Sequence, residues 1–274
     1  MTNVNPLLAE DRPLRGTAAD RVSSSTVLVI AHRGDSKVAP ENTLPAFASA
    51  VKAGADFVEL DYYHSADGVP VVCHDAHLDR TTNATTLWGG TKLKLSGKSL
   101  AELKLLDAGS WFSPQFAGTK IPTLAEAFDT IQAGSMTLVE RKGGQPTTCV
   151  ELLTQRKLLE RVVVQSFDWD YLAGCHRLSE NLLLAALGDK ALTADKLDRI
   201  AKTGARIVAW ENKGMNESTI AAIHARGWKA WVWTVDEPRR IGELVHAKID
   251  GVITNRPAQT RVAVEAVEGL LKHR

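Results

Sequence analysis

From Val27 onward, short apolar runs alternate with longer segments whose apolar residues recur every three or four positions. The short runs predict buried strands, and the longer segments predict amphipathic helices. This alternation is typical of a parallel sheet whose strands are joined by crossover helices. About nine strand candidates follow one another, at residues 27–31, 57–63, 69–75, 136–140, 162–167, 182–187, 206–210, 229–235 and 251–254.

A turn at Asp67-Gly68 separates the second strand candidate from the third and predicts a hairpin. One arm of this hairpin is then extra, and eight strands remain for a closed barrel. Polar residues follow so many of the strands that a barrel with its chemistry at one end is favoured over an open sheet. The predicted fold class is therefore α/β, a (β/α)8 TIM barrel.

A single barrel domain is predicted over residues 26–260. Within it, residues 76–122 are too long for an ordinary connection and predict a small insertion after the third strand region. We expect a flexible tail at residues 1–25 and a C-terminal helix or tail at residues 261–274.

The charges are nearly balanced, with 33 basic and 32 acidic residues, so the chain has no overall attraction for nucleic acid or an anionic membrane. Three scattered cysteines are too few for a disulfide framework or a thiolate metal site. The first 25 residues lack the apolar core of a secretory signal, and no apolar run is long enough to span a bilayer. We expect a soluble, cytoplasmic protein without a nucleic-acid partner or stable membrane insertion; a homodimer is compatible with the sequence.

Acidic residues interrupt two of the predicted strands. Glu59 and Asp61 are two positions apart, so their side chains leave the same face of a strand, and Glu140 ends another strand. Buried carboxylates are costly unless a cation lies between them. Each of these residues alone also fits a solvated strand end, but together they predict an all-oxygen site that suits Mg²⁺ or Ca²⁺ rather than zinc.

Two histidines, His32 and His74, directly follow the apolar runs of predicted strands, and the hairpin brings His74 near Glu59. Two histidines beside a metal held by carboxylates can act as general base and general acid. A hydrogen-bonded structural role is the alternative for each of them.

Arg33 and Lys142 each lie one or two residues beyond a candidate catalytic or metal-binding residue. Cations in these places can contact the oxygens of a phosphate, or they can form salt bridges with the neighbouring acids. Phe167 and Trp233 follow or end strands and could form the wall of a substrate pocket or part of the core. The absence of a P-loop, a dinucleotide fingerprint and a nucleophile elbow argues against nucleotide hydrolysis, NAD chemistry and serine hydrolase chemistry.

Taken in order, these residues form a pattern that resembles the glycerophosphodiester phosphodiesterase family over roughly residues 27–257. The segments that carry the resemblance are His32-Arg33-Gly34, Pro40-Glu41-Asn42-Thr43, Glu59-Leu60-Asp61, Asp67-Gly68-Val69-Pro70, His74-Asp75, Leu78-Asp79-Arg80-Thr81-Thr82, Leu106-Asp107-Ala108-Gly109-Ser110-Trp111-Phe112, Glu140 with Lys142, Ser166-Phe167, Trp233-Thr234-Val235 and Asp250-Gly251-Val252-Ile253-Thr254.

The resemblance implies a barrel enzyme with one divalent cation, Mg²⁺ or Ca²⁺. The implied roles are metal binding for Glu59, Asp61 and Glu140, acid–base catalysis for His32 and His74, phosphate contacts for Arg33 and Lys142, and orientation of the His32 loop for Glu41.

The expected reaction is metal-dependent hydrolysis of a glycerophosphodiester to sn-glycerol 3-phosphate and an alcohol. One alternative is a lysophospholipase D or sphingomyelinase D-like phosphodiesterase, whose acyl-bearing substrate would need an apolar groove near Trp88, Trp111 and Phe112. A non-catalytic sensor of phosphate ligands is the alternative of another class.

Overall fold

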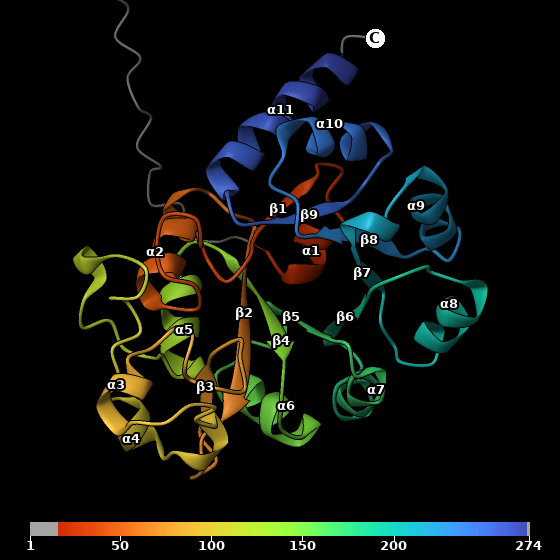
Figure 1. Cartoon of the computed structure of the whole chain (residues 1–274). Helices are drawn as coiled ribbons and strands as arrows, with labels where there is room; N and C mark the ends of the chain where they lie inside the picture. The colour runs from red at the N-terminus through yellow and green to blue at the C-terminus, as the bar shows by residue number, and fades with distance from the viewer. Residues whose placement is uncertain (1–15, 273–274) are drawn as a thin grey trace, which may run out of the picture.

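The structure is a computed structural model that describes residues 16–272. Parallel strands close into a barrel, because the first strand pairs with both the second and the last (Figure 1). The eight barrel strands are β1 (Leu28–Ala31), β2 (Phe57–His64), β4 (Met136–Arg141), β5 (Val162–Ser166), β6 (Leu183–Gly188), β7 (Ile207–Glu211), β8 (Lys229–Trp233) and β9 (Gly251–Thr254). The predicted (β/α)8 barrel is thus confirmed.

The extra strand is the second arm of the predicted hairpin, β3 (Pro70–Val72), which pairs antiparallel with β2. Helices join the barrel strands and follow the last of them. These helices are α2 (Leu44–Lys52), α5 (Leu124–Ile131), α6 (Pro146–Gln155), α7 (Trp169–Leu178), α8 (Ala194–Ala201), α9 (Glu217–His224), α10 (Pro238–His246) and α11 (Pro257–Lys272).

Helix α5 illustrates how these helices pack. Its buried residues are Leu124, Ala127, Phe128 and Ile131, which recur with the spacing of one helix face. Thr123 caps the first turn, because its hydroxyl accepts the amide N–H of the third helical residue while the side chain of that residue accepts the N–H of Thr123. This three- and four-residue spacing is the pattern from which the sequence predicts amphipathic helices.

The N-terminal segment differs from the prediction. Residues 1–15 of the expected tail lie outside the described residues, but α1 (Ala18–Val22) is a capped helix within it. Ala18 and Val22 are buried in one apolar cluster with residues that open several barrel strands, Leu28, Phe57 and Met136. A flexible tail is therefore wrong for residues 18–22, because two apolar residues one turn apart cover the start of the barrel.

At the C-terminus, α11 begins at Pro257, four residues before the predicted boundary at residue 261. Residues 76–122 contain the short helices α3 (Ala84–Trp88) and α4 (Leu100–Leu103) beside β3 and α5 (Figure 1). This segment has an apolar cluster of its own, which includes Leu78, Leu95 and Leu106. It therefore packs as a small unit against the hairpin side of the barrel.

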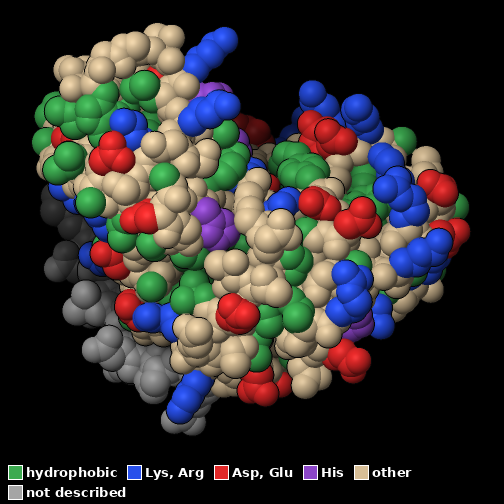
Figure 2. Space-filling model, turned by 90° about the horizontal axis from the view of Figure 1, so that it is seen from below, with side chains coloured by type: hydrophobic (Ala, Val, Ile, Leu, Met, Phe, Trp, Pro, Cys, Tyr) green, Lys and Arg blue, Asp and Glu red, His purple; other side chains and the backbone are tan. Residues whose placement is uncertain are grey.

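Surface charge is mixed. In the view from below, Lys and Arg side chains are interspersed with Asp and Glu side chains (Figure 2). None of the helices between residues 16 and 272 is long and apolar enough to cross a membrane.

Candidate active site

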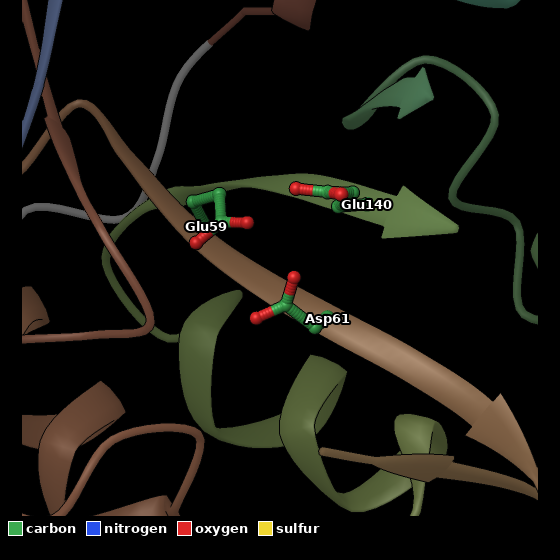
Figure 3. Close-up of side chains that lie close together, drawn as sticks. All are labelled: Glu59, Asp61 and Glu140. Atoms are coloured by element: carbon green, nitrogen blue, oxygen red, sulfur yellow. The ribbon is translucent and has the colours of Figure 1, made fainter. Parts of the chain in front are cut away.

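Three carboxylates meet where β2 and β4 lie side by side (Figure 3). Glu59 and Asp61 share one face of β2, and the parallel register pairs Asp61 with Glu140 of β4. One oxygen from each of the three side chains lies within 4.8 Å of the others, and all three residues are buried. The strand positions predicted this convergence, and the structure brings the three predicted ligands together.

Burial and mutual repulsion disturb the ionisation of this cluster. Burial, with the charges of Asp61 and Glu140, raises the pKa of Glu59 well above its ordinary value. Burial, with the charge of Asp61, raises the pKa of Glu140 to about 7. The cluster therefore holds more negative charge than its surroundings stabilise.

Two cations partly offset this charge. The guanidinium Nε of Arg33 lies 3.4 Å from Asp61 Oδ2. The ammonium of Lys142 lies 3.2 Å from Asp61 Oδ1 and forms an ion pair with Glu140. From the sequence, Arg33 and Lys142 were expected either to contact a phosphate or to form salt bridges with neighbouring acids. The salt bridges are present, and both cations also line the pocket described below.

Asn42 fixes one of the carboxylates and was not among the predicted site residues. Its side-chain Nδ2 donates a hydrogen bond of 2.8 Å to Asp61 Oδ2, and the backbone N–H of Asp61 donates to Asn42 Oδ1 at 3.1 Å. Asn42 has a φ of 58°, which asparagine tolerates better than most residues. Thr43, the next residue, is the N-cap of α2, and the Asn42 side chain binds Asp61.

The two candidate histidines have different partners on the same ring atom. His32 Nδ1 lies 2.7 Å from the amide oxygen of Asn255, whereas His74 Nδ1 lies 2.6 Å from the carboxylate of Asp75. Both partner atoms are acceptors, so each ring carries a proton on Nδ1 and has Nε2 left for chemistry. Burial and the charge of Arg33 lower the pKa of His32 to about 4, so His32 is neutral at neutral pH.

Ion pairs connect the loops that carry these histidines. Glu41 Oε1 accepts from Arg33 at 2.9 Å and from Arg80 at 2.7 Å. Arg80 also binds Asp75, with 2.6 Å between Nε and Oδ2. Glu41 therefore contacts the residue that follows His32, while Arg80, in the inserted segment, links Glu41 to the partner of His74.

A pocket of about 220 Å³ lies between these groups. It is lined by His32, Arg33, Glu59, His74, Glu140, Lys142, Gln165, Phe167, Leu187, Trp233 and Ile253. The Phe167 and Trp233 rings meet edge to face with their centroids 5.7 Å apart, so both predicted wall residues border the pocket. Glu41 and Asp61 are predicted site residues that support the pocket without lining it.

Comparison with known proteins identifies the family. A model of the glycerophosphoryl diester phosphodiesterase family matches residues 32–259. The chain belongs to this family. The glycerophosphodiester phosphodiesterase of Bacillus subtilis is 33% identical to it over 259 residues, covering 86% of each protein. That of Caldanaerobacter subterraneus is 32% identical over 237 residues, covering 84% of this chain and 94% of that protein.

Membership of the glycerophosphoryl diester phosphodiesterase family also agrees with a solved structure. An Oleispira antarctica phosphodiesterase, in complex with the product sn-glycerol-3-phosphate, superposes with a TM-score of 0.80 at 29% identity. The match covers 89% of this chain and 99% of that one. The predictions of this family and of a phosphodiesterase enzyme are confirmed.

The raised pKa of Glu140 leads to a prediction about the metal-free protein. Glu140 ionises near 4.5 in the unfolded chain and near 7 in the folded one, so folding loses stability as pH rises between these values. The free energy of unfolding of Glu140→Gln should therefore rise relative to the parent by roughly 3–4 kcal/mol across this window, at about 1.4 kcal/mol per pKa unit. Urea unfolding with chelator at both ends of the window measures this gain.

Glu265→Gln is the control for the general effect of replacing a carboxylate by an amide, because Glu265 is an exposed residue of α11. A stability difference between Glu140→Gln and the parent that does not change with pH would contradict the raised pKa of Glu140.

Proposed function

We propose that the protein hydrolyses glycerophosphodiesters to sn-glycerol 3-phosphate and an alcohol, with one divalent cation, Mg²⁺ or Ca²⁺. The observation that carries this proposal is the pocket in which two differently partnered histidines face a buried carboxylate cluster. Family membership and the product named for the Oleispira antarctica structure support the same reaction.

The donor set fits such a cation. Glu59, Asp61 and Glu140 offer oxygen atoms alone, as Mg²⁺ and Ca²⁺ prefer. Burial, and after it the neighbouring carboxylates, raises the pKa values of Glu59 and Glu140, so a bound cation would stabilise their ionised forms. When bound there, the cation would polarise a phosphate oxygen and offset the charge that develops in the transition state.

Formal charges support a phosphodiester as the ligand. Three carboxylates face the two cations Arg33 and Lys142, which leaves one excess negative charge. A divalent cation would turn this into one excess positive charge, which complements the single negative charge of a phosphodiester. Arg33 and Lys142 both line the pocket, where they would bind the non-bridging oxygens.

The partners of the histidines favour a division of labour. His32 is neutral and faces the uncharged amide of Asn255, so its Nε2 can accept a proton from the nucleophile. His74 faces the carboxylate of Asp75, which can offset the charge of an imidazolium that donates its proton to the departing alcohol. The nucleophile is water or, in a first step through a cyclic phosphate, the 2-hydroxyl of the glycerol.

Deacylated substrates are favoured over the alternatives. The three aromatic residues expected to form an acyl groove, Trp88, Trp111 and Phe112, do not line the pocket. All the predicted catalytic and metal-binding side chains are present, which argues against a non-catalytic sensor. We further propose a cytoplasmic setting, which the three buried, free cysteines support.

A comparison of two substrates with the same head group tests this choice. Because the pocket is small, about 220 Å³, and several charged side chains line it, glycerophosphoethanolamine should be hydrolysed with a kcat/KM at least about tenfold above that of lysophosphatidylethanolamine. Enzymatic determination of free ethanolamine measures both rates. Faster release from the lysophospholipid would favour the lysophospholipase D alternative, and release from neither would favour the sensor.

The assigned roles predict different substrate dependence for two variants. A 4-nitrophenol leaving group departs without protonation, so His74→Ala should hydrolyse glycerophospho-4-nitrophenol within about tenfold of the parent rate. On glycerophosphoethanolamine, the rate of His74→Ala should fall about 10²- to 10⁴-fold, which is the usual effect of removing a general acid. The rate of His32→Ala should fall by about the same factor on both substrates, because the hydrolysis of each needs the general base.

Release of nitrophenol and of ethanolamine measures the two activities. His246→Ala is the matched control, because this histidine bonds only to a carbonyl of its own helix among the described contacts. Equal losses for His74→Ala on both substrates would contradict its role as the acid.

A further inference from the structure

We propose that Asp236 is a positioning residue, which acts through the side-chain amide of Asn255 to hold His32 in the tautomer that a general base needs. The inference rests on the proposed function, since it assigns a partner to the proposed base. Asp236 and Asn255 both lie outside the pocket lining. They follow β8 and β9, and β9 pairs with β1, which ends just before His32.

Hydrogen bonds define which end of the Asn255 amide faces His32. Asn255 Oδ1 lies 2.7 Å from His32 Nδ1 and also accepts the hydroxyl of Ser36 at 3.0 Å. On its other side, Asn255 Nδ2 donates to Asp236 Oδ2 at 2.8 Å. A rotated amide would place its oxygen against the carboxylate of Asp236, where two acceptors repel each other.

Asp236 is itself held in place. Its Oδ1 accepts the Thr254 hydroxyl at 2.9 Å and the backbone N–H of Asn255 at 2.8 Å. The Thr254 hydroxyl in turn lies 3.0 Å from that of Thr260, in α11. The carboxylate therefore has a fixed direction, and its other oxygen, Oδ2, points at the Asn255 amide.

The orientation of the amide decides the chemistry of His32. With Asn255 Oδ1 facing the ring, the proton sits on Nδ1, and the lone pair of Nε2 is available to a nucleophile. With the NH₂ group facing the ring, Nδ1 would have to accept, and Nε2 would carry the proton and could not act as a base. Asp236 thus selects the reactive tautomer of His32. The neutral amide of Asn255 lies between them and keeps the negative charge of Asp236 away from His32.

Exchange of the two side chains separates positioning from general support of the fold. In D236N, the oxygen of the new amide should accept the two hydrogen bonds that Asp236 Oδ1 accepts now, from the Thr254 hydroxyl and from the backbone N–H of residue 255. Its NH₂ group then faces the side chain of Asn255. The Asn255 amide should therefore rotate so that its oxygen accepts from this NH₂ group. His32 should then take the Nε2–H tautomer, and kcat should fall about 10- to 100-fold with KM little changed.

In the exchanged variant D236N/N255D, the carboxylate at position 255 accepts from both the new amide at position 236 and His32, so the Nδ1–H tautomer and most of kcat should return.

Imidazole ¹⁵N NMR reports the tautomer of His32 independently of activity. The control is D250N, because Asp250 also binds a histidine, His224 Nε2 at 2.7 Å, but outside the pocket. D250N should leave both the His32 tautomer and kcat unchanged, even where it lowers stability.

An Nδ1–H tautomer and parental kcat in D236N would overturn the proposal, as would a folded exchanged variant no more active than D236N. If the exchanged variant does not fold, the tautomer of D236N decides. If the parent hydrolyses no glycerophosphodiester, the proposed function fails, while the NMR shifts still show whether Asp236 sets the tautomer.

Discussion

Three buried carboxylates on two adjacent parallel strands constrain the rest of the site. The register of β2 and β4 brings Glu59, Asp61 and Glu140 together, and burial raises the pKa values of Glu59 and Glu140. Arg33 and Lys142 reduce the repulsion but leave a net negative charge. A further cation would stabilise the ionised form of such a site, and this is how the fold would support the proposed metal-dependent reaction.

The residues around the carboxylates act mainly by fixing the orientations of the Asp61 side chain and of the two histidine rings. Asn42 holds Asp61 by two hydrogen bonds, and Asp75 and Asn255 hold one ring nitrogen of each histidine. Arg80 extends this network into the inserted segment, where its guanidinium binds both Glu41 and Asp75. The insertion therefore contributes to the position of His74 and does not merely cover the barrel.

Strand residues of the site could be predicted from sequence because strand geometry is regular. Side chains alternate between the two faces of a strand, so Glu59 and Asp61, two positions apart, lie on one face. The ends of parallel strands meet at one end of a barrel. The partners Asn42, Asp75, Arg80 and Asn255 were not predicted as site residues, because they lie in loops, where spacing does not determine side-chain direction. The helix at Ala18–Val22 was missed because its two buried residues are too few to form a periodic pattern.

The most direct test of a metal-dependent phosphodiesterase is a ³¹P NMR time course on glycerophosphoethanolamine with Mg²⁺ or Ca²⁺, repeated with chelator. We expect conversion to sn-glycerol 3-phosphate that stops when the metal is removed. A transient cyclic phosphate would identify the glycerol 2-hydroxyl as the first nucleophile, and direct conversion would identify water. Conversion at an unchanged rate in chelator, or no conversion with either metal, would contradict the account.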